Sequence, residues 1–162
     1  REAEIAAMLD VPEFIRKVEA IYGYRHFIKD AGGSVCELDD PETLASLAEH
    51  TVIVYIRTSR ELEHLLIERA RLHPKPLYYR EAFLDEHLPM FMAERGYRDV
   101  DEIPPDDFVT WVFPRLFHAR LPRYEAIARE WGYTVEASAL GSVADEADFI
   151  ELVCRALANP NA

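Results

Sequence analysis

The sequence predicts an α/β fold built on a parallel β-sheet. The clearest strand is the run from Thr51 to Ile56, whose unbroken β-branched and aromatic residues are typical of a strand buried on both faces. Strand-like segments alternate with segments in which apolar residues recur every three or four positions, an order typical of right-handed crossover units. The 162 residues, 49% of them apolar, are enough for one sizeable core, so a single domain is expected.

The first half of the chain is expected to contain four helices and two strands. Apolar spacing predicts helices over 2–9 and 12–22, and the caps Asp40 and Thr58-Ser59 each start a further helix. A first strand is expected over 24–31, ending in a glycine loop, and the second is the Thr51 run.

Helices dominate the second half. They are expected over about 78–96 and 108–118, from Pro122 to Trp131, and over 145–157, with a third strand at 133–137. Three strands are fewer than the four to six of a usual sheet, so strands are expected to be missing from its N-terminal side.

Composition excludes several classes of protein. The formal charge of -12 disfavours a nucleic-acid or membrane-surface role. The two cysteines, Cys36 and Cys154, form no disulfide framework, which favours a reducing, cytoplasmic setting. No apolar run approaches the roughly 20 residues of a membrane-spanning helix, and the charged start is unlike a signal peptide.

Five short segments follow one another along the chain: Ile15-Arg16-Lys17-Val18-Glu19, Ala31-Gly32-Gly33-Ser34, His50 to Tyr55, Lys75-Pro76-Leu77 and Arg120-Leu121-Pro122-Arg123-Tyr124. In this order they resemble landmarks of the shikimate kinases, a branch of the P-loop kinase and ATPase superfamily. The resemblance implies a three-layer P-loop kinase-like fold with a parallel central sheet. It makes residues 1–162 a single partial domain, with a helical lid or insertion at about 73–119. Ile15, Ala31 and Lys75 depart from the family's usual aromatic, glycine and arginine, so the acceptor is expected to differ from shikimate.

The same resemblance implies roles for three basic residues. Arg16 and Arg120 stand where the family's arginines bind the carboxylate of a small anionic substrate, a task suited to a planar fork of donors. Lys75 stands in the lid, where it would act catalytically by screening the transferring phosphoryl group, with Arg69 and Arg71 nearby. Read without the resemblance, all of these are solvated surface charges.

The segment Asp30 to Ser34 is a candidate site from its own residues. Asp30 follows a predicted strand, where it would bind Mg²⁺ through water or accept a proton as a catalytic group. Gly32 and Gly33 would let a ligand approach the backbone, and Ser34 would add a hydroxyl. The alternative is a plain turn that Asp30 caps.

Other side chains give weaker signals. The six histidines show neither HExxH spacing nor a Cys/His array, so no zinc site is assigned. Seven aromatic residues of the insertion are expected to pack in a core rather than to line an acceptor pocket. They are Tyr78, Tyr79, Phe83, Phe91, Trp111, Phe113 and Phe117.

The motif GxxxxGK[ST], which holds nucleotide phosphates, does not occur, since none of the six glycines is followed by lysine. The expected function is an ATP-binding phosphotransferase or ATPase that uses Mg-ATP, with its nucleotide loop upstream of Arg1. The alternative is a non-catalytic anion-binding or regulatory module on a degenerate kinase scaffold. A sheet with exposed edges also predicts self-association into a homodimer.

Overall fold

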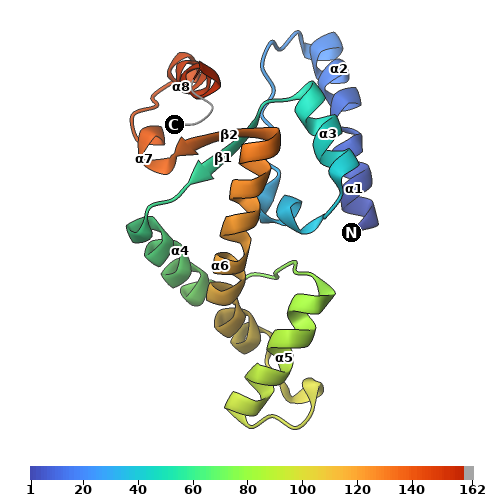
Figure 1. The fold of residues 1–162 in the computed structure, drawn as a ribbon, viewed down its shortest axis with the longest axis vertical. Coiled ribbons are helices and arrows are strands. Elements are labelled where there is room, and N and C mark those ends of the chain that lie inside the picture. The colour runs from blue at the N-terminus through green and yellow to red at the C-terminus, as the bar shows by residue number, and fades with distance from the viewer. Residues whose placement is uncertain (159–162) are drawn as a thin grey trace. The chain divides into compact units, whose positions relative to one another are not determined.

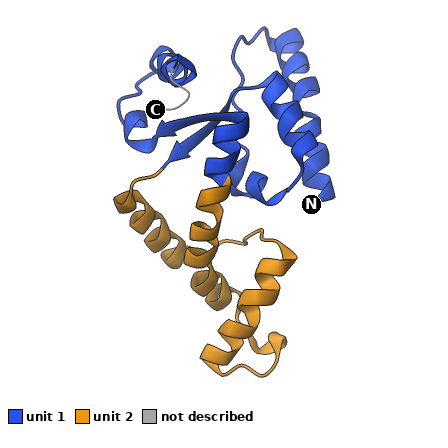
Figure 2. Ribbon diagram, viewed as in Figure 1, with its two compact units in different colours: residues 1–57, 124–162 blue, residues 58–123 orange. Residues whose placement is uncertain are grey.

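The chain folds into two compact units in the computed structural model, which describes residues 1–158 (Figure 2). Unit 1 consists of Arg1–Arg57 and Tyr124–Ala162, and unit 2 consists of Thr58–Arg123. Each unit has a hydrophobic cluster of its own. The expected insertion at about 73–119 lies inside unit 2.

The expected three-layer α/β fold is wrong. Residues 1–158 are mostly helical, and their sheet has two strands, β1 (Ile53–Arg57) and β2 (Gly132–Glu136) (Figure 1). The two strands are parallel, with Ile53 opposite Gly132 and Arg57 opposite Glu136. They correspond to the second and third predicted strands, and their parallel pairing agrees with the prediction.

The strand predicted over 24–31 does not form. These residues lie in an irregular segment, and Tyr24, Phe27 and Ile28 are exposed. An extended segment becomes a strand only when a neighbour pairs with its backbone, and the sheet formed by residues 1–158 contains β1 and β2 alone. Apolar composition suggested a strand here, but pairing decides whether one exists.

Four of the helices of unit 1 begin and end close to the predicted residues, whereas the two short segments at 32–37 and 137–140 were not predicted to be helical. Gly23 ends α2 in the left-handed conformation, with φ of 67°, and the Asp40 side chain caps α3 by accepting from the Thr43 N–H. The helical segments of this unit are α1 (Glu2–Leu9), α2 (Val11–Tyr22), the 3₁₀ helix η1 (Gly32–Glu37), α3 (Pro41–His50), α7 (Ala137–Leu140) and α8 (Glu146–Ala158).

The core of unit 1 joins its N-terminal helices to the residues after η1. Met8, Val11, Leu38 and Leu47 form its buried cluster, against which Ile53 of β1 packs. Gly132 lies so close to β1 that a Cβ at this position would be 2.4 Å from the Ile53 carbonyl oxygen. The pairing of the two strands therefore requires glycine at the start of β2.

Unit 2 is built from helices. It contains α4 (Arg60–Leu72), α5 (Glu81–Arg95), the 3₁₀ helix η2 (Val100–Glu102) and the first part of α6 (Pro105–Trp131), whose remainder from Tyr124 belongs to unit 1. Two separate helices were predicted where α6 runs unbroken, so the predicted break between 118 and 122 is wrong. Pro114 and Pro122 lie inside α6 and each removes one backbone donor without ending the helix.

Aromatic side chains fill the core of unit 2. Phe91, Phe108, Trp111 and Val112 are buried, and the partly buried side chains around them include Tyr79 and Phe83. The Phe91 ring lies 5.3 Å from the Phe108 ring and 5.4 Å from the Trp111 ring, the spacing of favourable aromatic pairs. Packing is thus the role of Tyr79, Phe83, Phe91 and Trp111, as the sequence predicted.

Charge is divided unevenly between the units. Ten of the 18 basic residues but only twelve of the 30 acidic residues lie in 58–123, which leaves a formal charge of -2 there and of -10 in the rest of the chain. An anion therefore meets far less repulsion at unit 2 than at unit 1.

Within 1–158, no helix combines the length and the apolar character that spanning a bilayer requires.

Candidate functional site

Asp30 caps the glycine turn. Its Oδ1 accepts a hydrogen bond from the Gly32 N–H at 2.8 Å, and Gly32 has φ of 60°, which glycine adopts without strain. This geometry is the one expected under the alternative interpretation, in which the Asp30 side chain stabilises its own turn. No cluster of three or more potential metal-binding side chains occurs within residues 1–158.

The other polar groups of this segment also bind the chain itself. The Ser34 hydroxyl donates to the Glu4 carboxylate, and the Gly33 carbonyl accepts from the Tyr124 hydroxyl at 2.7 Å. The Gly32 N–H and the Ser34 hydroxyl, which were expected to contact a substrate, therefore both bind groups of the chain.

Arg16 binds an acidic neighbour on its own helix. Its Nε and Nη2 donate to the two Glu13 oxygens at 2.9 and 2.7 Å, a bidentate pair on the exposed face of α2. This hydrogen bonding from Arg16 is the main reason that the pKa of Glu13 falls to about 2. The fork of donors that was expected to hold a substrate carboxylate therefore holds a side chain of the protein.

Lys75 and Arg120 belong to unit 2. Lys75 is exposed in the segment after α4, and the Arg120 guanidinium in α6 donates to the Tyr78 carbonyl. In unit 1, Gly32, Gly33 and Ser34 begin η1, and Asp30 precedes them in the chain. The roles predicted for all these residues stay predictions.

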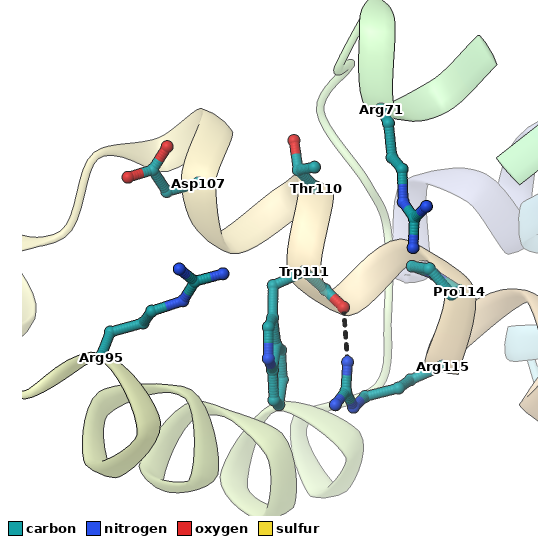
Figure 3. A pocket seen from close by; sticks show the side chains of 7 residues that line it. All are labelled: Arg71, Arg95, Asp107, Thr110, Trp111, Pro114 and Arg115. Carbon is teal, nitrogen blue, oxygen red and sulfur yellow. Dashed lines mark hydrogen bonds between the residues drawn. The ribbon is translucent and has the colours of Figure 1, made fainter. Parts of the chain in front are cut away.

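A different group of side chains converges on a cavity of about 370 Å³ in unit 2, here called the arginine pocket (Figure 3). Its cations come from three helices, Arg71 from α4, Arg95 from the end of α5 and Arg115 from α6. This volume is that of a small-ligand site. The residues that complete its lining all belong to α6: Asp107, Thr110, Trp111 and Pro114.

Arg115 is held in place by Trp111, one helical turn before it. The guanidinium carbon lies 3.6 Å from the centre of the Trp111 ring, and Nη1 donates to the Trp111 carbonyl oxygen at 2.8 Å (Figure 3). The indole is itself fixed, because it is 8% exposed and its Nε1 donates to Glu94 at 2.9 Å. Arg115 is therefore preorganised, and a ligand need not order it.

The other two arginines keep donors for a ligand. Arg71 Nη1 donates to Glu68 at 2.6 Å, a bond that uses one of its five N–H groups. The Arg95 guanidinium lies 5.9 Å from the centre of the Phe91 ring. Three cations and the single carboxylate of Asp107 make the pocket a place for a compact anion, to which the Thr110 hydroxyl can also donate.

Part of this pocket can be recognised in the sequence. Arg71 was noted only as a charge beside Lys75, whereas Arg95 and Arg115 were not singled out. The four-residue spacing of Trp111 and Arg115 on a predicted helix could have indicated their contact. Nothing in the linear sequence indicates that Arg71 and Arg95 reach the same cavity.

Comparisons of the chain with protein-family models, with curated proteins and with solved structures gave no match.

Proposed function

We propose that this chain binds a small phosphate-type anion in the arginine pocket. The observation that carries the proposal is the convergence of Arg71, Arg95 and Arg115 on one cavity, with Arg115 preorganised against Trp111. A guanidinium matches the geometry of phosphate oxygens, and three of them outweigh the single carboxylate of the lining. This is the role of an anion-binding or regulatory module.

Calorimetric titration with inorganic phosphate tests this proposal. The chain should bind phosphate, and Arg115→Ala should weaken binding about 10- to 100-fold, the loss typical of a charge-assisted hydrogen bond. Arg69→Ala is the matched control, since Arg69 lies on α4, is exposed and does not line the pocket. Equal losses of affinity in the two variants would mean that the loss comes from the lower positive charge of the chain rather than from the pocket, and would contradict the proposal.

A phosphotransferase or ATPase is the second candidate, favoured by the order of the five segments that resemble shikimate kinases. Such an enzyme would bind a small anionic acceptor, and it would bind Mg-ATP through a nucleotide loop that these 162 residues do not contain. Titration with Mg-ATP followed by an assay for released phosphate separates the candidates. ATP binding with turnover supports the enzyme, and phosphate binding without either supports the module.

A further inference from the structure

A second cavity of about 420 Å³ in unit 2 is also lined by cationic side chains. Arg80, Arg115 and Arg123 contribute to it, together with His87 and the single acidic residue Glu86. Cationic side chains thus outnumber carboxylates in its lining, as they do in the arginine pocket. Arg115 is common to both cavities.

The two cavities follow one another along α6. The α6 residues that line only the arginine pocket, from Asp107 to Pro114, precede Arg115, and those that line only the second cavity, Ala119 and Arg123, follow it at four-residue spacing. Positions 111 and 119 are about 12 Å apart along a helix axis, because each residue adds roughly 1.5 Å. Arg115 lies between these two groups of residues and lines both cavities.

The second cavity has a fixed wall, like the first. The His87 ring stacks on Phe83 with their centres 4.0 Å apart, and its Nδ1 lies 2.9 Å from the Phe83 carbonyl oxygen. Because a carbonyl only accepts, Nδ1 carries the proton, and this bond fixes the orientation of the ring. The lining of the second cavity thus contains one side chain of fixed orientation, His87, as that of the arginine pocket contains Arg115.

We propose that the two cavities together bind one ligand with two anionic groups, one group in each cavity, as in a linear oligophosphate. The proposal rests on the phosphate binding proposed above for the arginine pocket, and it specifies the ligand class. Joining two groups makes the second contact intramolecular, so affinity rises steeply once the ligand is long enough to reach both cavities.

Calorimetry with a length series tests the inference. The full chain is titrated, without magnesium, with orthophosphate, diphosphate, triphosphate and tetraphosphate. Affinity should rise about tenfold or more at the length that reaches both cavities. One long anion should bind per chain.

The matched variants Ala119→Glu and Ala119→Gln locate the gain. Both enlarge the same helical position, but only Ala119→Glu puts a negative charge in the second cavity. It should abolish the gain with length, whereas Ala119→Gln should keep most of the gain. Circular dichroism confirms that both variants are folded.

Two results would overturn the inference and leave the proposed function intact: orthophosphate binding with no gain along the series, or an equal gain in both variants. If the longer anions bind and orthophosphate does not, the proposal that the arginine pocket binds a single phosphate is contradicted. Absence of binding by any member of the series would overturn both proposals.

Discussion

The partners of an arginine determine whether it is available to a ligand, and Arg16 and Arg115 illustrate the two cases. Arg16 directs two donors at the Glu13 carboxylate, so a ligand would have to replace an existing bidentate pair. Arg115 donates one N–H to the Trp111 carbonyl and rests its plane on the indole. This contact orients the guanidinium and leaves most of its five donors unused by that bond.

The Glu13 pair gives a prediction for pH. In Arg16→Ala, the pKa of Glu13 should rise from about 2 toward its ordinary 4.5, because its strongest hydrogen-bond donor is gone. Lys17→Ala should shift it less, since Lys17 is the weaker partner. Carboxyl-resolved NMR titration measures both values. An unchanged pKa in Arg16→Ala would show that the pair does not form in solution.

The sign of the linked stability follows from the lowered pKa of Glu13. The pair stabilises the folded chain fully above pH 4.5, where the carboxyl is ionised in both states, and this stabilisation is lost as the pH falls toward about 2. Arg16→Ala should therefore unfold with less dependence on pH in this window. The whole effect is small, because both side chains are largely exposed.

At the scale of elements, local chemistry predicted helix ends well. The caps Asp40 and Ser59 and the terminal glycines Gly23 and Gly96 act within one or two turns of the chain, so the sequence shows them directly. The strand at 24–31 failed because a strand depends on a partner distant in sequence. The prediction that a new helix starts at Pro122 was wrong, because α6 continues through this proline although the proline removes one backbone hydrogen bond.

The candidate site was harder to predict than the helices that form it. The arginine pocket joins α4, α5 and α6, and its basic residues are 20 or more positions apart in sequence. Each arginine alone resembles a solvated helix residue. Only the packing of the aromatic core of unit 2, which fixes Trp111, shows that Arg115 shares a cavity with Arg71 and Arg95.

The pairing of β1 and β2 gives a prediction at the same scale. Gly132→Ala should destabilise unit 1 by about 1–3 kcal/mol, because the new Cβ would lie 2.4 Å from the Ile53 carbonyl oxygen and one backbone must move. Gly141→Ala is the control, since its nearest contact, to the Ser138 oxygen, is 3.3 Å. Urea unfolding measures both. A Gly132→Ala variant as stable as Gly141→Ala would contradict the close approach of the strands.

At the scale of the whole molecule, the two units differ in charge and in core. Unit 1 carries most of the net negative charge and an aliphatic cluster around Met8 and Leu38, whereas unit 2 is nearly neutral and has an aromatic cluster around Phe91. An anion is attracted to a site when local cations outweigh the field of the chain. The low net charge of unit 2 thus favours its arginine pocket for this role.

Separate cores predict separate unfolding. Phe91 is 0% and Leu38 1% exposed, so Phe91→Ala should destabilise unit 2 by about 3–5 kcal/mol and Leu38→Ala should destabilise unit 1 by about 2–5 kcal/mol. Hydrogen exchange resolved by segment should show faster opening of 58–123 in the first variant and of 1–57 in the second. Phosphate should slow exchange mainly in 58–123, because binding stabilises the unit that holds the ligand. Equal acceleration of both segments by either variant would instead mean that the chain unfolds as one cooperative unit.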